Sequence, residues 1–351
     1  MTSPAYDDGP IAALRRIAFL LERGREDTYK VKAFRGAAAA LLPLDPEEVA
    51  AHVEQGTLSS IPGVGASSAA VVSEAVRGRM PERLSRLEAE HGGDLTAGGH
   101  DLLGQLRGDL HSHSDWSDGG SPIEEMAFTA LELGREYQVL TDHSPRLKVA
   151  RGLSAERLAR QLDVIDAVNG QLDGSGFTLL KGIEVDILDD GSLDQTEEML
   201  ERLDVRVASV HSKLRMDAAA MTRRMVTAVQ NPMVDVLGHC TGRLVTGGRG
   251  KRPESEFDAR AVFEACAETG TAVEINSRPE RRDPPTRLLE LARDIGCLFA
   301  IDTDAHAPGQ LDFLAYGAER AEAAGIDPDR IVTTWPKDRL LEWAGRPGEA
   351  G

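Results

Sequence analysis

The chain has 351 residues and a formal net charge of −18, with 58 acidic and 40 basic residues. Such a charge argues against a protein that coats nucleic acid by bulk electrostatic attraction, and the length allows one large domain or two unequal ones. The three cysteines, Cys240, Cys266 and Cys297, do not make a disulfide framework. The first residues form no secretory signal and no apolar run could span a bilayer, so we expect a cytoplasmic protein without membrane contact.

Residues from Pro10 to about Glu90 have a helical pattern, in which apolar side chains recur at helical spacing. The segment Arg15–Arg35 contains seven basic and three acidic residues, so a contact with a polyanion is expected in this part of the chain. A glycine-rich stretch, His91–His100, is typical of a linker. We therefore predict a helical domain over residues 1–95, a linker over 96–104 and a second domain over 105–345.

From Leu106 onward, short β-type runs alternate with helical patterns. Seven strands are expected, at Leu106–Leu110, Tyr137–Thr141, Thr178–Ile183, Val205–Val210, Val234–Leu237, Ala272–Ile275 and Leu298–Ile301. The span is near the roughly 250 residues of a typical (β/α) barrel. The predicted fold class is α/β, a seven-stranded (β/α) barrel preceded by a small all-α domain. A doubly wound open sheet is the alternative.

Histidines and acids follow six of these runs, as if each strand ended where a metal ligand begins. The candidate ligands are His111, His113, Asp118, His143, Glu184, His211, His239, Asp304 and His306. The pattern favours the barrel, because a closed ring brings the carboxyl ends of its strands together. Imidazoles and carboxylates without cysteine suit Zn²⁺, Mn²⁺ or Fe²⁺ bound for hydrolysis. Nine candidates exceed the needs of one tetrahedral ion, so we expect two or three ions, with Glu184 bridging two of them.

Other polar residues near the strand ends are expected to support this site. Asp142 and Asp186 would orient metal-bound imidazoles rather than bind metal themselves. A phosphate substrate would need cations, and the loops after the strands offer Lys148, Arg151, Arg243, Arg278 and Arg281. Arg243 and Arg278 are the preferred phosphate-binding residues, because each closely follows a strand. His52, His91 and His100 lie outside the pattern and are expected to be solvated.

These motifs together resemble the PHP (polymerase and histidinol phosphatase) family over about residues 105–335. Gly182-Ile-Glu184-Val-Asp186 and Asp304-Ala-His306 are similar to the family in general. Asp142-His-Ser, Thr241-Gly-Arg243 and Glu274-Ile-Asn276 are similar to the C-terminal PHP domain of bacterial family X DNA polymerases. The resemblance implies a distorted seven-stranded barrel and a trinuclear site that hydrolyses phosphoesters with Mn²⁺, Zn²⁺ or Fe. In that subgroup it implies 3′–5′ exonuclease and 3′-end-processing phosphatase activity. Glu184, His211, Arg243 and Arg278 would be the catalytic residues.

The resemblance also suggests how the ligands divide among the ions. His111, His113, Glu184 and Asp304 would hold the first ion, and Glu184, His211 and His239 the second. Asp118, His143 and His306 would hold the third. Cys240 departs from the subgroup, which usually has proline before the Thr-Gly-Arg motif, and this change affects the loop of Arg243 rather than the metals.

The N-terminal segment resembles the small helical lyase domain of the same polymerases. Ile61-Pro-Gly63-Val-Gly65 looks like a helix-hairpin-helix, in which glycines let backbone N–H groups approach a DNA phosphate. The candidate DNA-binding residues are Gly63, Val64, Gly65, Lys30, Lys32 and Arg35. Ser67 and Val71 stand where the lyase carries lysines, so lyase chemistry is not expected. Between the two parts there is no room for a polymerase palm.

Three hypotheses follow. The first is a DNA 3′-end-processing nuclease or phosphatase of DNA repair, with a separately encoded polymerase or repair protein as a candidate partner. The second is a small-molecule phosphatase, of histidinol-phosphate or nucleotide type, whose helical domain only packs or dimerises. The third is a DNA-binding adaptor with an inert barrel, and the complete ligand set argues against it. The hairpin favours DNA as the substrate, whereas the charge of −18 favours a small molecule.

Overall fold

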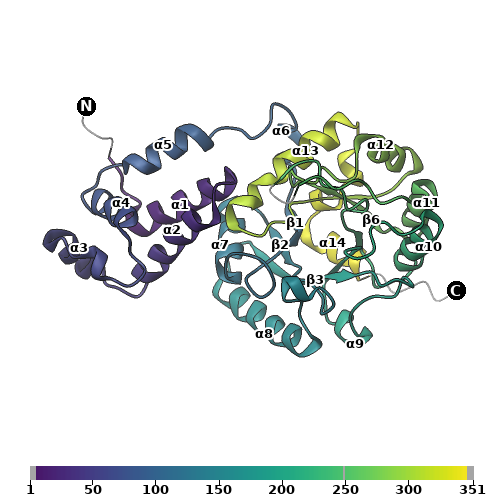
Figure 1. The fold of residues 1–351 in the computed structure, drawn as a ribbon, viewed down its shortest axis with the longest axis horizontal. Coiled ribbons are helices and arrows are strands. Elements are labelled where there is room, and N and C mark those ends of the chain that lie inside the picture. Colours follow the sequence, from purple (N-terminus) through teal and green to yellow (C-terminus); the bar gives the residue numbers. More distant parts are fainter. Residues whose placement is uncertain (1–4, 248–249, 346–351) are drawn as a thin grey trace. The chain divides into compact units, whose positions relative to one another are not determined.

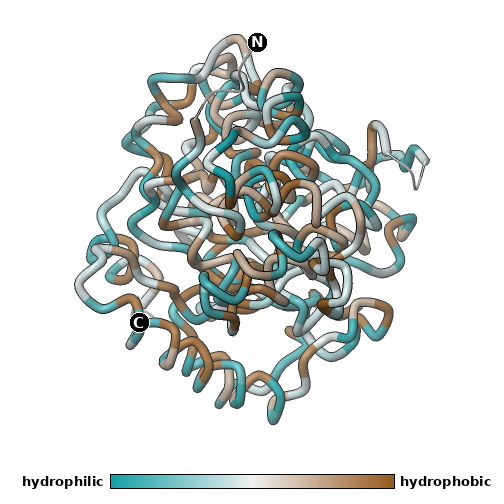
Figure 2. Tube along the Cα trace, turned by 90° about the vertical axis from the view of Figure 1, so that its left-hand side faces the viewer, coloured by the Kyte–Doolittle hydropathy of each residue, from teal (hydrophilic) through white to brown (hydrophobic). Residues whose placement is uncertain are grey.

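The computed structural model describes residues 5–247 and 250–345, and it divides the chain into two compact units, Met1–Asp94 and Leu95–Gly351. Figure 1 shows a small group of helices in the first unit and a ring of helices around strands in the second. Along the helices, hydrophobic and hydrophilic residues alternate within each turn, as expected of amphipathic helices (Figure 2). None of the helices in the described ranges combines the length and apolar character that crossing a membrane would demand.

The described part of the first unit consists of helices and one isolated antiparallel bridge between Ala5 and Arg79. The helices are α1 (Gly9–Arg23), α2 (Thr28–Leu41), α3 (Pro46–Gln55), the short η1 (Leu58–Ser60), α4 (Ala66–Val76) and α5 (Glu82–His91). Helix α2 begins where the Asp27 side chain accepts a hydrogen bond from the Tyr29 amide, and α3 begins with proline and two acids in its first turn. The unit encloses a small core to which α1 contributes Leu14 and Ile17 and α2 contributes Phe34, all buried.

The second unit is a seven-stranded parallel barrel. Its strands are β1 (Gly108–Ser112), β2 (Tyr137–Leu140), β3 (Thr178–Asp186), β4 (Val205–Ser209), β5 (Val236–Leu237), β6 (Ala272–Asn276) and β7 (Phe299–Asp302), and they pair in sequence order. The ring is nearly closed, because Ser112 forms a parallel bridge with Ala305 and the His113 amide donates to the Ala305 carbonyl. The predicted barrel is confirmed, and the open-sheet alternative is wrong.

Helices lie before the first strand, between the strands and beyond the last one. They are α6 (His100–Leu103), α7 (Ile123–Glu132), η2 (Lys148–Ala150), α8 (Ala155–Gln171), α9 (Glu197–Leu200), α10 (Ala218–Val229), α11 (Ala259–Thr269), α12 (Thr286–Ile295), η3 (Pro308–Phe313), α13 (Leu314–Ala323), η4 (Pro328–Arg330), η5 (Val332–Thr334) and α14 (Lys337–Ala344). Helix α9 is only a single turn, which leaves β3 and β4 joined by a mostly irregular segment.

Residues 96–104, expected as a linker, lie within the second unit. The amides of Ala97, Gly98 and Gly99 donate to the carboxylates of Glu319 and Glu322 on α13. Gly99 has a φ of +79°, and a Cβ at this position would lie 2.4 Å from the Glu319 nitrogen. Only glycine fits this close approach, so the glycine-rich sequence serves packing against the barrel rather than flexibility.

The barrel interior is closed at the amino ends of its strands. Inward-facing residues such as Leu110, Val139 and Val207 form one cluster with Trp335 and Trp343 from the last part of the second unit. The Tyr137 hydroxyl donates to backbone carbonyls in this same segment, including that of Trp335 at 3.0 Å. Polar side chains can therefore gather only at the opposite end, where the strands finish.

Candidate metal centre

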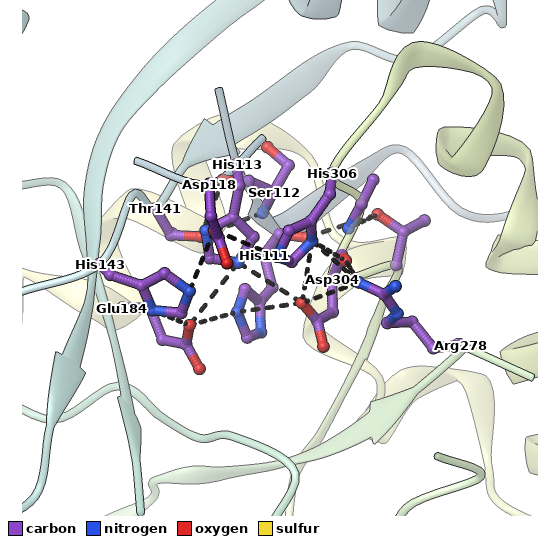
Figure 3. A network of polar contacts seen from close by, with 12 residues as sticks. His111, Ser112, His113, Asp118, Thr141, His143, Glu184, Arg278, Asp304 and His306 are labelled. Carbon is purple, nitrogen blue, oxygen red and sulfur yellow. Dashed lines mark hydrogen bonds and ion pairs between the residues drawn. The ribbon is translucent and has the colours of Figure 1, made fainter. Parts of the chain in front are cut away.

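All nine candidate ligands converge at the carboxyl ends of the strands. His111 lies in β1 and Glu184 in β3, while the other seven lie in the loops that follow β1, β2, β4, β5 and β7. The imidazole centroids of His111 and His113 are 5.1 Å apart, and those of His113 and His306 are 4.3 Å apart. Figure 3 shows these side chains pointing toward one another around Glu184 and Asp304.

Glu184 lies at the centre of the cluster and is 1% exposed. One oxygen, Oε1, is 3.0 Å from His211 Nε2 and 2.9 Å from His239 Nε2. The other oxygen, Oε2, is 2.8 Å from His143 Nδ1 and 3.3 Å from His111 Nε2. Each oxygen therefore faces a different pair of imidazoles, which is the arrangement that a carboxylate needs to bridge two cations.

The two other acids complete the cluster at its remaining sides. Asp304 Oδ1 is 3.4 Å from His113 Nε2, and Asp118 Oδ1 is 3.3 Å from both His143 Nε2 and His306 Nε2. Three groups of ligand atoms are close enough to share an ion: His113, Asp118, His143 and His306; His111, His113 and Asp304; and His143, Glu184 and His211. The grouping differs from the expected one, because His113 and His143 each belong to two groups, Glu184 is not grouped with His111, and His239 belongs to none.

The donor atoms fit divalent cations better than they fit one another. Several buried atoms in the cluster make no hydrogen bond; they are His111 Nε2, both ring nitrogens of His113, His143 Nδ1, Glu184 Oε2, His211 Nε2 and His239 Nδ1. Buried polar atoms are normally paired, so such a concentration needs an explanation. Imidazole nitrogen and carboxylate oxygen are ligands of Zn²⁺, Mn²⁺ and Fe²⁺, and these residues fit a multinuclear centre of that kind.

Carboxylates behind the ligands fix the orientation of two imidazoles. Glu274 in β6 lies 2.5 Å from His111 Nδ1, and Asp186 in β3 lies 3.3 Å from His211 Nδ1. A hydrogen on Nδ1 can donate to these acids, which leaves Nε2 with a free lone pair on the side of the cluster. Asp142 instead accepts from Ser114, Ser117 and Gln161 and so holds the loop after β1.

Glu274 belongs to the Glu274-Ile-Asn276 motif, but the sequence analysis predicted no role for it in the site. The signal was present, because Glu274 is an acid in the middle of an apolar run, Ala272–Asn276, where every residue is buried. A buried acid in a strand requires a partner. Its partners are the His111 ring, the His239 amide at 2.5 Å and the Asn276 amide group at 3.2 Å.

The electrostatic balance of the cluster favours bound cations. Burial raises the pKa of Glu184, but His211 and His111 outweigh it and hold this pKa well below its usual range. Burial, His306 and His143 lower the pKa of His113 to about 3. Burial lowers the pKa of His143, but Glu184 and Asp118 outweigh it and raise this pKa to about 10. The ionised carboxylates thus create a negative potential that attracts a proton or, in its place, a divalent cation.

The predicted phosphate-binding cations have different surroundings. Arg278 donates toward His306 Nδ1 at 2.9 Å and lies at the edge of the cluster opposite His143 and Glu184 (Figure 3). Arg281, which was not one of the two preferred phosphate-binding residues, is 2.9 Å from Asp304 Oδ2. Arg243 does not face the cluster, because its guanidinium donates to the carbonyls of Arg281 and Arg282. Its expected contact with phosphate at the metals is therefore not supported by its position.

Two more candidate cations lie in the loop after β2. Lys148 is exposed, and Arg151 donates to the carbonyls of Asp115 and Ser117 in the loop that carries Asp118. Arg151 therefore holds a ligand-bearing loop in place. Of the histidines outside the pattern, His100 is exposed, whereas His52 is half-buried and its Nδ1 is 2.8 Å from the Thr57 hydroxyl.

In the first unit, the predicted DNA-binding residues are only partly accessible. Gly63 and Gly65 are exposed, and no side chain caps the α4 N-terminus that follows them. Val64 is buried, so only its backbone could contact DNA. Lys30 and Lys32 are exposed on α2.

Arg35 was predicted to bind DNA, and the structure gives it a different partner. Its guanidinium pairs with the buried carboxylate of Glu22 at 2.8 and 3.1 Å, and its side chain is only 15% exposed. This bidentate pair neutralises a buried acid, so Arg35 has a structural role in the helical unit.

Comparison with known proteins fits this geometry. Residues 109–278, which run from β1 to the start of the loop after β6, match the sequence family described as the PHP domain. The barrel is a PHP domain. The prediction of a metal-dependent phosphoesterase is thereby confirmed at the level of the family, whose members catalyse that class of reaction.

Two relatives illustrate the range of PHP proteins. The chain is 42% identical over 230 residues to the DNA polymerase/3′-5′ exonuclease PolX of Bacillus subtilis strain 168, covering 66% of this chain and 39% of that protein. It is 27% identical over 241 residues to a "Probable phosphatase" of Thermoanaerobacter sp. strain X514, covering 64% of this chain and 89% of that one. The chain thus matches well under half of the polymerase but most of the phosphatase.

A solved structure is also similar to the PHP barrel. The histidinol phosphate phosphatase of Lactococcus lactis subsp. lactis Il1403, complexed with zinc, L-histidinol and phosphate, is 18% identical and aligns with a TM-score of 0.47. The alignment covers 63% of this chain and 95% of that chain.

Proposed function

We propose that this protein hydrolyses phosphate esters at the 3′ end of DNA, with the PHP barrel as the catalytic domain and the helical unit as a DNA contact. The observation that carries the hydrolytic part is the convergence of nine ligand side chains, six of which have buried nitrogen or oxygen atoms that lack hydrogen-bond partners. An inert scaffold would not retain such atoms unpaired, since each costs about 1–3 kcal/mol when buried. The adaptor hypothesis is therefore not favoured.

The nine residues would hold two or three divalent metal ions. His111, His113 and Asp304 would share one ion, and Glu184 would link it to a second ion near His211 and His239. Asp118, His143 and His306 would hold a third on the more exposed side, where Asp118 is 30% exposed. When bound, such ions activate water and stabilise the attacking and leaving oxygens at phosphorus.

The residues around the ligands would position the substrate and the imidazoles. Arg278, at the edge of the cluster, is the cation best placed to bind the substrate phosphate, and its side chain is 20% exposed. Arg281 would balance the charge of Asp304, which it contacts directly. Glu274 and Asp186 would keep His111 and His211 in the tautomer that offers Nε2 to the metals.

DNA is the preferred substrate for two reasons. The first is the 42% identity to a protein named as a DNA polymerase and 3′-5′ exonuclease, a value well above the 27% shared with the "Probable phosphatase" of Thermoanaerobacter. The second is the exposed, uncapped N-terminus of α4 after Gly63 and Gly65, which offers backbone N–H groups to a phosphate. The exposed Lys30 and Lys32 would add positive charge in the helical unit.

The test is a hydrolysis assay with Mn²⁺ or Zn²⁺ on single-stranded and gapped DNA labelled at its 5′ end, beside a panel of small phosphomonoesters. Stepwise shortening from the 3′ end, lost in Glu184→Gln, is the expected result. Deletion of residues 1–94 should weaken binding to gapped DNA and reduce its salt dependence. Full nuclease activity in Glu184→Gln would refute the assignment of the centre.

The second candidate is a phosphatase of small phosphomonoesters. It is favoured by the "Probable phosphatase" relative, of which the chain covers 89%, and by the net charge of −18. Hydrolysis confined to the small esters, with no shortening of DNA under any metal, would select this function.

A further inference from the structure

A groove on the second unit lies beside the metal centre and has no role in the function proposed so far. It has a volume of about 960 Å³ and is bordered by the loop between β5 and α11, the start of α10 and the start of α12. This volume lies within the range of about 300–1,000 Å³ that is usual for ligand sites.

The walls of the groove combine apolar surface with positive charge. Leu244, Val245 and Phe257 supply apolar surface, and each is partly exposed. Arg243, Lys251 and Arg287 supply positive charge. We call these six residues the basic groove.

Cations outnumber acids in the lining of the groove, which holds Arg243, Lys251, Arg252 and Arg287 against Glu254 and Glu256. Glu254 is paired with both Arg287 and Arg243, at 3.5 Å in the second case, so one carboxylate is shared by two guanidinium groups. With Lys251 exposed at the rim, the groove keeps an excess of positive charge on a chain whose net charge is −18. A region of opposite sign on an acidic protein is suited to a negatively charged ligand.

The basic groove is connected to the metal centre through the loop after β6, which contacts residues of both. Arg243 donates to the carbonyls of Arg281 and Arg282 in this loop, and the Val245 amide donates to the Glu280 carbonyl at 2.8 Å. In the same loop, Arg281 contacts Asp304 at 2.9 Å. The loop after β6 would therefore lie between a ligand bound at the metals and a ligand bound in the groove.

We propose that the basic groove binds the nucleotide that lies next to the hydrolysed one in a DNA strand. The base would lie against Leu244, Val245 and Phe257, and the phosphate would contact Lys251 and Arg287. This inference rests on the proposed DNA-directed function and specifies its substrate as a strand of at least two nucleotides. A small phosphomonoester would occupy only the metal centre and would not reach the groove.

The experiment compares the full-length protein with Lys251→Glu and Arg287→Glu. Both residues are exposed, and neither touches the metal ligands. KM is measured for a single-stranded oligonucleotide and for the small ester p-nitrophenyl phosphate. Each substitution should raise KM for the oligonucleotide about tenfold, the scale expected when one charge-assisted phosphate contact is lost. KM for the small ester should not change.

Arg160→Glu is the matched control. Arg160 on α8 is 63% exposed and paired with Glu156, as Arg287 is 64% exposed and paired with Glu254. The control should leave both KM values unchanged.

The outcomes separate the two proposals. Oligonucleotide hydrolysis with an unchanged KM in both groove variants would overturn the groove while leaving the DNA-directed function intact. An equal rise of KM in Arg160→Glu would show a general charge effect and would also overturn it. No oligonucleotide hydrolysis by the wild-type protein would overturn the proposed function and, with it, the groove.

Discussion

Glu274 should control the metal affinity of the centre although it is not one of the nine ligands. It forms three contacts in a fully buried position: with the His111 ring, the His239 amide and the Asn276 side chain. Removing an acid behind a metal-bound imidazole typically weakens metal binding about 10- to 100-fold, or roughly 1.4–2.8 kcal/mol. Glu274→Ala should lie at the upper end, because it also leaves the buried His239 N–H without an acceptor.

Glu274→Gln should have an intermediate effect. The glutamine keeps the shape of the side chain but has one acceptor oxygen, so it can satisfy either the His111 ring or the His239 amide and not both. Metal content after dialysis against a chelator series, measured by mass spectrometry, gives the affinity of each ion, and circular dichroism verifies the fold. Retention of all ions at wild-type affinity by a folded Glu274→Ala would refute the orienting role.

Three further predictions concern stability and the site's supporting contacts. Arg35→Met should destabilise the helical unit by about 3 kcal/mol, measured by urea denaturation, because it removes the bidentate cation that pairs with the buried Glu22 carboxylate. Gly152→Ala should lower the melting temperature and weaken metal binding, because the alanine Cβ would lie 1.8 Å from the carbonyl oxygen of Ser144, next to His143. A wild-type melting temperature and metal affinity in this variant would contradict the close packing. Burial and Asp109 raise the pKa of Asp302 well above its usual range, so stability is lost as the pH rises through this raised value. Between pH 5 and pH 8, the free energy of unfolding should therefore fall less in Asp302→Asn than in the wild-type protein. Equal losses in the two proteins would contradict the raised pKa of Asp302.

The sequence predicted the order of the barrel strands well, because each buried parallel strand is a short apolar run bounded by turn residues. It placed the first strand two residues early. Leu106 is apolar and buried but lies before the ladder, which begins at Gly108 opposite Tyr137. A strand boundary depends on the neighbouring strand's register, which the local sequence does not contain.

The polar contacts of arginines were harder to predict. Arg35 and Arg243 follow patterns typical of phosphate-binding residues, yet one neutralises Glu22 and the other ties two loops together. A guanidinium can bind a carboxylate, a carbonyl or a phosphate equally well in geometric terms, so its partner is decided by the fold. The location of the imidazoles was easier to predict, because they follow successive strands and the carboxyl ends of all strands meet at one end of a barrel.

The apolar cluster that closes the barrel at the amino ends of its strands bears on when the metal centre can form during synthesis. The last ligand, His306, leaves the ribosome before the segment that supplies Trp335 and Trp343, so the ligand-bearing strands exist before the barrel interior is filled. Until α14 arrives, where the Trp343 ring nitrogen donates to the Gly270 carbonyl, the inner apolar faces of these strands lack their final cover. Domains generally fold as units, so we expect the metal centre to form once α14 is in place rather than as each ligand emerges.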